Sequence, residues 1–238
     1  MIQSFIFDLY GTLVDISTDE SMPSLWRRLA LLYSLQDAKY TPLELETAYA
    51  YAVEEQIQRR AGQLPNVCKA YVEPDILSVF EALYLLKGVR PSMDMAAAAA
   101  LFFRTLSMKH IRLYPAAKKV IYALKNKGKG VYLLSNAQAA FTVPELKKLG
   151  LYSLFDGVVL SSVVGIKKPD KAIFEHILSQ YDLLPETCVM IGNDIEADML
   201  GAASVGMAGR YIHTNQSPRG QASLPPSCRQ IQRLTELL

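Results

Sequence analysis

The chain has 238 residues, of which half are hydrophobic and a fifth are charged, and its formal net charge is +2. This length suits one large domain or a domain with a sizeable insert. The small charge excess provides no concentrated basic face, so nucleic-acid binding is not expected. The three cysteines are odd in number and far apart, which excludes a disulfide framework and favours a reducing compartment.

Targeting and membrane signals are also missing from the pattern. The N-terminus has no basic region that leads into a long apolar stretch, so no secretory signal is expected. The most apolar segment, residues 93–108, contains Arg104 and is shorter than the roughly 20 apolar residues that cross a bilayer. We therefore expect a cytoplasmic protein that makes no membrane contact.

The predicted elements change character along the chain. Residues 4–7 form a short apolar run that predicts a strand, and residues 18 to about 109 then show only helical patterns. From about residue 112, strand-like runs alternate with helical patterns, and residues 228–238 look like a closing amphipathic helix. Within these regions we predict helices at 23–35, 42–61, 74–86, 93–108, 115–127, 170–181 and 196–205, and strands at 130–134, 157–161, 188–192 and 209–213.

These elements predict an α/β fold with two parts. Apolar runs without polar alternation are typical of parallel strands that helices cover on both faces. The alternation of strand and helix indicates a doubly wound, Rossmann-like parallel sheet. We assign residues 1–16 and 111–238 to this core and residues 17–110 to an inserted helical cap, and we expect a ligand cleft between the two parts.

Polar side chains gather at the predicted strand ends. Asp8 follows the first strand, Ser135 and Asn136 end the second, and Asn193 and Asp194 follow the fourth. Ligands of open parallel sheets bind beyond the carboxyl ends of the strands. A loop after the third strand adds Lys167 and Lys168 to the same edge.

Four segments together resemble the haloacid dehalogenase superfamily of aspartate-nucleophile hydrolases. They are "FDLYGTLVD", "LLSNA", "KKPDKAIF" and "IGNDIEADMLGA", and they occur in the family's order. The helical insert resembles the C1-type cap of that family. The resemblance covers the whole chain and implies a hydrolase with a small-molecule substrate, acting as a monomer or homodimer.

The resemblance also implies roles for single residues. Asp8 would attack the substrate and form a covalent intermediate, Lys168 would neutralise the incoming negative charge, and Ser135 would donate a hydrogen bond to a substrate oxygen. The supporting positions are Gly11, whose turn offers backbone N–H groups to an anion, Thr12, which orients the turn, and Asn136, which helps to position the substrate.

A magnesium ion is implied as the cofactor, because Mg²⁺ prefers oxygen ligands. The resemblance offers Asp8, the backbone carbonyl of Tyr10, and either Asn193 or Asp194 as ligands. The family usually has an aspartate where this chain has Asn193, so the choice between these two stays open. Asp198 would hold the loop from behind by hydrogen bonds.

Tyr10 departs from the pattern of the family's phosphatases. Those enzymes have a second aspartate at this position, which protonates the leaving oxygen and then activates water. A tyrosine, with an ordinary pKa near ~10, is a poor base at neutral pH. The 2-haloacid dehalogenases of the family have tyrosine here, and their cap supplies an arginine that grips the substrate. Arg27 and Arg28 are the candidates for that arginine in this chain.

The motifs therefore leave three functions open. We expect a Mg²⁺-dependent phosphatase of small phosphorylated metabolites, in which Asp19 and Glu20 are the candidates to replace the missing aspartate. The first alternative is a metal-independent 2-haloacid dehalogenase, which needs no acid because a halide leaves without a proton. The second alternative is a non-catalytic member that binds a ligand or a protein.

Overall fold

The computed structural model describes residues 1–238, and it confirms the α/β class. Its main sheet has six parallel strands in the order β5-β4-β1-β6-β7-β8. The first strand therefore lies inside the sheet between β4 and β6, although about 120 residues of sequence separate it from β4. The strands are β1 (Ser4–Phe7), β4 (Gly130–Ser135), β5 (Gly157–Leu160), β6 (Cys188–Gly192), β7 (Ala208–Ile212) and β8 (Cys228–Ile231).

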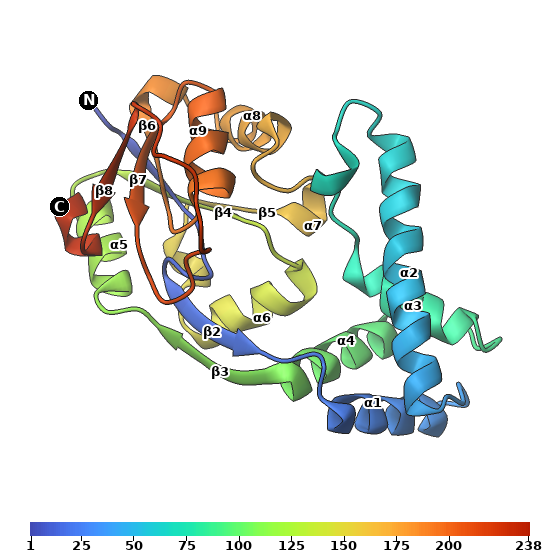
Figure 1. Cartoon of the computed structure of the whole chain (residues 1–238). Helices are drawn as coiled ribbons and strands as arrows, with labels where there is room; N and C mark the ends of the chain where they lie inside the picture. The colour runs from blue at the N-terminus through green and yellow to red at the C-terminus, as the bar shows by residue number, and fades with distance from the viewer.

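Helices cover both faces of this sheet (Figure 1). In β1, Phe5 and Phe7 pack into one buried cluster, which also contains residues of α5 and α6. Ile6, between them, packs into a second cluster with residues of α8, because successive side chains of a strand point to opposite faces. The helices of this part are α5 (Ala117–Asn126), α6 (Ala139–Lys148), α7 (Ser161–Val164), α8 (Lys171–Gln180) and α9 (Gly201–Ser204), with short helical turns η2 (Tyr152–Leu154), η3 (Pro185–Thr187), η4 (Ile195–Leu200) and η5 (Leu234–Leu237).

The insert after β1 is helical and has a hydrophobic core of its own. This core is a cluster of 18 buried residues that is rich in aromatic side chains, including Trp26, Tyr33, Phe80 and Phe103. Four helices of the insert surround this core, to which the sheet domain adds only Phe141 of α6, and a short turn that contributes no residue to it completes the insert, on the right of Figure 1. They are α1 (Pro23–Leu35), α2 (Pro42–Gln63), η1 (Lys69–Tyr71), α3 (Ile76–Leu85) and α4 (Met93–Ser107).

Two antiparallel strands join the insert to the sheet domain. β2 (Val14–Thr18) pairs with β3 (Met108–Leu113), with Val14 opposite Leu113. We did not predict either strand. None of the helices combines the length and the apolar character that a membrane span requires.

The insert touches the sheet domain at two further places. Phe103 of α4 stacks near Phe141 of α6, and Arg104 forms a 2.7 Å ion pair with Glu145 of α6. Farther along, Val72 forms an antiparallel bridge with Ile166 in the loop before Lys168. The insert is thus anchored beside two of the loops that carry predicted site residues.

Two predicted helices differ from the structure. Residues 228–238 form strand β8 and the turn η5, because Cys228 and Ile231 pair with Gly209 and Ile212 of β7. Their apolar spacing of three residues suited a helix equally well, and pairing with the sheet decided the outcome. The helix predicted at 196–205 is a π-helical turn, η4, that continues into α9.

Candidate active site

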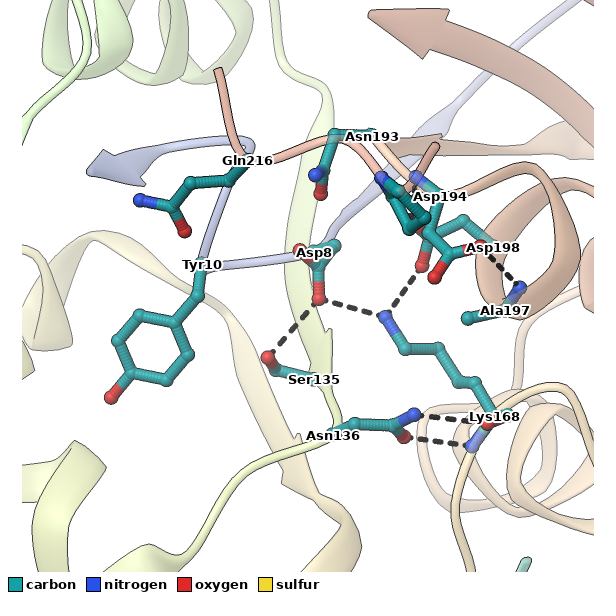
Figure 2. A pocket seen from close by; sticks show the side chains of 11 residues that line it. Asp8, Tyr10, Ser135, Asn136, Lys168, Asn193, Asp194, Ala197, Asp198 and Gln216 are labelled. Atoms are coloured by element: carbon teal, nitrogen blue, oxygen red, sulfur yellow. Dashed lines mark hydrogen bonds and ion pairs between the residues drawn. The ribbon is translucent and has the colours of Figure 1, made fainter. Parts of the chain in front are cut away.

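The predicted strand ends meet in one cavity of about 180 Å³. It lies beyond the carboxyl ends of β1, β4 and β6, the position at which open parallel sheets bind ligands. No residue of the insert lines it, so the cavity differs from the core–cap cleft that we expected. Figure 2 shows its lining residues, which are Asp8, Tyr10, Ser135, Asn136, Lys168, Asn193, Asp194, Ala197, Asp198, Gln216 and Pro218.

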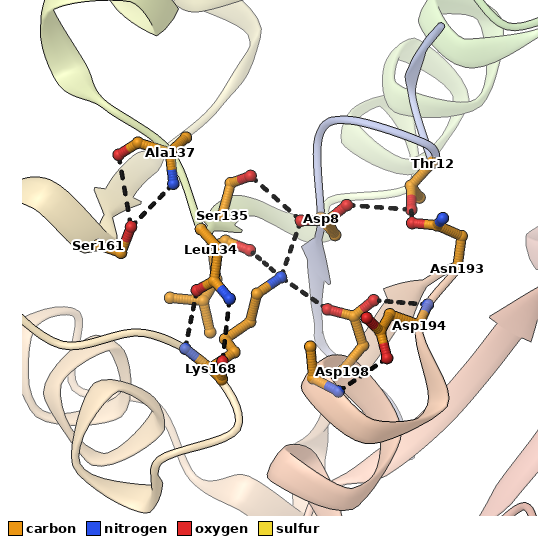
Figure 3. A network of polar contacts seen from close by, with 12 residues as sticks. Asp8, Thr12, Leu134, Ser135, Ala137, Ser161, Lys168, Asn193, Asp194 and Asp198 are labelled. Atoms are coloured by element: carbon orange, nitrogen blue, oxygen red, sulfur yellow. Dashed lines mark hydrogen bonds and ion pairs between the residues drawn. The ribbon is translucent and has the colours of Figure 1, made fainter. Parts of the chain in front are cut away.

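Asp8 lies at the centre of the polar contacts. Its Oδ1 accepts hydrogen bonds from Ser135 Oγ at 3.1 Å and from Lys168 Nζ at 2.8 Å (Figure 3). Its Oδ2 accepts only a longer bond, 3.3 Å, from the hydroxyl of Thr12. The carboxylate is therefore fixed through one oxygen, while the other keeps capacity for a further partner.

Lys168 is fully enclosed, with 3% of the residue exposed. Besides Asp8, its ammonium donates to Asp198 Oδ1 at 2.6 Å and to the carbonyl of Leu134 at 3.0 Å, so all three of its hydrogens have acceptors. Burial by itself would lower the pKa of Lys168, but the carboxylates of Asp198 and Asp8 outweigh it and raise the pKa. The ammonium thus stays charged beside Asp8.

Asp198 shares the ammonium from the other side. Burial raises the pKa of this carboxyl to about 7, against the opposing attraction of Lys168 and with a further rise from Asp8. Its second oxygen accepts the backbone N–H of Asp194 at 3.1 Å. Asp198 therefore ties Lys168 to the loop after β6. Gly192 is required at that point, because a Cβ there would lie 2.0 Å from an Asp198 oxygen.

The side chain of Asn136 binds the backbone of Lys168 and is not free to contact a substrate in the cavity. Its side-chain nitrogen donates to the Lys168 carbonyl at 2.9 Å, and its oxygen accepts the Lys168 N–H at 2.7 Å. Both ends of the amide are therefore used in positioning the lysine loop. This contact favours a positioning role for Asn136 over the substrate contact suggested by sequence.

The loops after β1 and β6 pack tightly against each other. Asn193 Oδ1 accepts a hydrogen bond from Thr12 at 3.2 Å. Gly11 has a φ of +87°, and a Cβ on it would lie 2.4 Å from the Asn193 amide nitrogen, so no other residue fits here. Asp194 accepts the N–H of Ala197 at 3.0 Å with one oxygen and so caps η4.

The oxygen atoms at this end of the cavity suit a magnesium ion. No three His, Cys, Asp or Glu side chains gather into a metal cluster. Asp8, Asn193 and Asp194 nevertheless line one cavity, and the carbonyl of Tyr10 accepts no hydrogen bond. Mg²⁺ accepts such mixed oxygen ligands and retains several waters, so the residues present fit it.

The hydroxyl of Tyr10 points away from Asp8, as Figure 2 shows. It donates to Glu145 and lies 2.9 Å from the hydroxyl of Thr142, both on α6. Burial and the nearby Glu145 carboxylate raise the pKa of Tyr10 above its ordinary value. The phenol is therefore neither a base nor an available acid at the cavity.

Several predicted residues lie elsewhere, and three residues that were not predicted line the cavity, namely Ala197, Gln216 and Pro218. Arg27 and Arg28 are exposed on α1, and Asp19 pairs with Lys109 at 2.8 Å. The cavity is lined by none of these three residues, and Glu20 does not line it either. Sequence reasoning missed Gln216 and Pro218, which reach the cavity from the segment between β7 and β8; that segment has no pattern beyond that of a polar loop.

The fold and this site together define an α/β protein with a Rossmann-like parallel sheet and a buried aspartate–lysine pair at its strand ends. Residues 2–206 match the model of the haloacid dehalogenase-like hydrolases, and the chain belongs to this family. The family and the parallel core with its helical insert confirm the fold and family that the four motifs predict.

Several curated relatives of this chain are phosphatases by name. A glyceraldehyde 3-phosphate phosphatase of Methanopyrus kandleri is 25% identical over 100% of this chain and 96% of its own length. The enzyme of the same name from Pyrococcus furiosus is 26% identical over 87% of this chain and 78% of its own. A third, from Methanothermobacter thermautotrophicus, is 31% identical over 50% of this chain, which spans only 53% of that relative.

Solved structures share the fold over almost the full length. A 2-haloacid dehalogenase from Pseudomonas syringae pv. Tomato superposes with a TM-score of 0.66 at 20% identity, over 100% of this chain and 96% of its own. A HAD hydrolase from Bacillus subtilis, determined with bound magnesium, has a TM-score of 0.56 at 19% identity, over 99% and 96% of the two chains.

Proposed function

We propose that the protein is a Mg²⁺-dependent phosphatase of small phosphorylated metabolites with Asp8 as its nucleophile. The observation that carries the proposal is the pairing of Asp8 with a buried, charged Lys168 beside oxygen atoms that suit Mg²⁺. The names of the curated relatives, glyceraldehyde 3-phosphate phosphatases among them, support a phosphorylated substrate.

In the first step, an oxygen of Asp8 bonds to the phosphorus while the bond from phosphorus to the leaving oxygen breaks. Lys168 and Ser135 are both within hydrogen-bond distance of the same Asp8 oxygen. The ammonium of Lys168 offsets the charge that the phosphoryl group brings, and the hydroxyl of Ser135 donates a hydrogen bond. Because the Tyr10 hydroxyl points away, the leaving oxygen takes its proton from water. Phosphates with stable leaving anions should therefore react fastest.

The metal would be held by Asp8, the carbonyl of Tyr10, and Asn193 or Asp194. When bound, Mg²⁺ supplies positive charge that binds and polarises the phosphoryl oxygens. Asp198 and Thr12 hold these loops in place, through the Asp194 N–H and the Asn193 amide respectively. In the second step, water attacks the phosphorus of the aspartyl phosphate, and the carboxylate of Asp8 is restored.

One observation favours a second candidate, the 2-haloacid dehalogenase. Tyr10 stands where the family's phosphatases have an acid, and the structure leaves its hydroxyl engaged with Glu145. A halide needs no proton, so such a site could displace it with Asp8 alone. This chemistry would need no Mg²⁺, and that difference separates the two candidates.

A substrate screen tests both. Phosphate esters and 2-haloacids are offered to the protein with Mg²⁺ and with EDTA, and the Asp8→Asn variant is the blank. We expect phosphate release that EDTA abolishes and added Mg²⁺ restores. Halide release that survives EDTA would replace the proposal with the dehalogenase. No turnover of any compound by the wild-type protein, equal to the blank, would support the non-catalytic alternative.

A further inference from the structure

The cavity contains an amide from an unexpected part of the chain. Gln216 lies between β7 and β8, about 200 residues after Asp8, yet both line the same cavity. Figure 2 shows its side chain on the side of Asp8 where Tyr10 and Asn193 also lie. In this family's phosphatases, a second aspartate would serve that side of the nucleophile, and this chain has Tyr10 there instead.

The orientation of the Gln216 amide is fixed by its partners. Its nitrogen donates to Asp15 Oδ1 at 2.7 Å and to the carbonyl of Ile16 at 2.8 Å. The carbonyl of Ile16 and the ionised carboxylate of Asp15 can accept but cannot donate. A flipped amide, which presents its oxygen to them, would therefore lose both hydrogen bonds. Its oxygen takes no hydrogen bond within the protein, and in Figure 2 it points to the Asp8 side while the nitrogen points away.

The anchor of this amide is itself rigid. Asp15, at 3% exposure, accepts from the Arg112 side chain at 2.9 Å and from Asn215 at 3.2 Å. Arg112 is on β3, so the loop with Gln216 is held by both strands that connect the insert to the sheet. A side chain fixed in this way can present a hydrogen-bond acceptor at a constant position.

The other neutral side chains of the cavity already have partners. Ser135 donates to Asp8, and both ends of Asn136 bind the backbone of Lys168. Asn193 accepts from Thr12, and the Tyr10 hydroxyl binds α6. The Gln216 oxygen is therefore a free side-chain acceptor in the cavity that the nucleophile also lines.

We infer that Gln216 orients the water that hydrolyses the covalent aspartyl phosphate. This inference rests on the proposed phosphatase function. The amide oxygen accepts a hydrogen bond from the water, whose oxygen bonds to phosphorus as the bond from phosphorus to Asp8 breaks. The electron pair of the broken bond returns to the Asp8 carboxylate, and both water protons leave with dihydrogen phosphate. Glutamine takes no proton in this step, and glutamines orient attacking water in the same manner in GTP hydrolysis.

The test separates formation of the aspartyl phosphate from its hydrolysis. p-Nitrophenyl phosphate with Mg²⁺ is the probe, because its nitrophenolate leaves without a proton and reports the first step by its colour. In Gln216→Met, rapid mixing should show a burst of one nitrophenolate per enzyme, followed by steady turnover at least about tenfold slower than in the wild type. The matched control is Asn215→Ala, which removes a neighbouring hydrogen bond to the same Asp15 without touching the cavity.

The outcomes are distinct. A burst with slow turnover in Gln216→Met, and wild-type behaviour in Asn215→Ala, supports the inference. If Gln216→Met turns over as the wild type does, or only its KM rises, Gln216 has no part in the hydrolysis step. Equal losses in both variants would assign the effect to the Asp15 anchor and overturn the inference. If the wild-type protein releases not even one nitrophenolate per enzyme, the phosphatase proposal itself fails, and the inference with it.

Discussion

The ammonium of Lys168 binds two carboxylates, those of Asp8 and Asp198. Replacing Asp8 and replacing Lys168 should therefore change the free energy of unfolding by very different amounts. The nearest oxygens of Asp8 and Asp198 both lie within 2.8 Å of Nζ, so they are at most about 5.6 Å apart. At an effective dielectric constant of about 20, two ionised carboxylates at that separation repel by roughly 3 kcal/mol or more. Asp8→Asn removes this repulsion and one buried charge, and Lys168 keeps Asp198.

We therefore expect Asp8→Asn to change the free energy of unfolding by no more than about 1 kcal/mol, because the relieved repulsion and the removed desolvation cost of one buried charge together offset the lost attraction to Lys168. Lys168→Met has the opposite character, because it leaves two buried carboxylates without a cation. Loss of one partner of a buried ion pair costs about 3–5 kcal/mol. For a chain of this size, that corresponds to a fall in melting temperature of roughly 10 °C.

Urea unfolding followed by circular dichroism, in EDTA to keep all variants free of metal, measures both values. Lys167→Met is the control, because this neighbouring lysine carries the same charge but does not line the cavity. An equal loss of stability in Asp8→Asn and Lys168→Met would contradict this unequal cost, and so would a Lys168→Met variant that unfolds at the same urea concentration as the control.

Three further variants address the surroundings of the site. Tyr10→Phe should keep kcat within about threefold, because the hydroxyl points away from Asp8, and a larger fall in kcat would contradict this geometry. The same variant should lose about 1–3 kcal/mol of stability, because Glu145 loses a hydrogen-bond donor. Glu73, which lies in the insert between η1 and α3, accepts hydrogen bonds from Ser161 and Gln138 of the sheet domain. Burial raises the pKa of Glu73, so this carboxyl contributes stability while protonated and loses it as the pH rises above 4.5 through the raised pKa. Urea titrations from pH 4 to 8 should therefore show the wild type losing stability relative to Glu73→Gln as the pH rises. If the two proteins differ in free energy of unfolding by the same amount at every pH, the pKa of Glu73 is not raised. The double variant Arg27→Ala, Arg28→Ala should keep kcat/KM within about twofold on the best substrate of the screen, because the effects of surface substitutions away from a site rarely exceed ±0.5 kcal/mol. A tenfold loss of kcat/KM would show that these arginines act in the site.

The sequence predicts the buried strands well because burial leaves a local trace. β1, β4, β5 and β6 are nearly continuous apolar runs and β7 is interrupted only by Arg210, and the predicted bounds of each agree with the structure within one residue. β2 and β3 carry no such trace, since they are partly exposed, and each is defined only by pairing with the other. β8 differs from its predicted helix for a related reason. Its two buried residues have a spacing that also suits a helix, and only the pairing with β7 makes this segment a strand.

The site shows the same division between local and distant information. Asp8, Ser135, Lys168 and Asp198 could be predicted because strand ends and motif spacing mark them. The partners of Tyr10 could not, since Glu145 and Thr142 are more than 130 positions away and belong to an unremarkable helix. Gln216 sits in a polar loop, and only the folded chain shows that it faces the cavity.

The pairing of β2 with β3 has a consequence for how this chain can be re-engineered. Thr18 and Met108 are opposite each other in that ladder, so the parallel sheet meets the intervening 89 residues as a hairpin with adjacent ends. Closing such a hairpin costs entropy that grows only slowly with its length. A bundle of different size, or a short turn, could therefore be grafted between these two positions while the register of the six parallel strands stays unchanged.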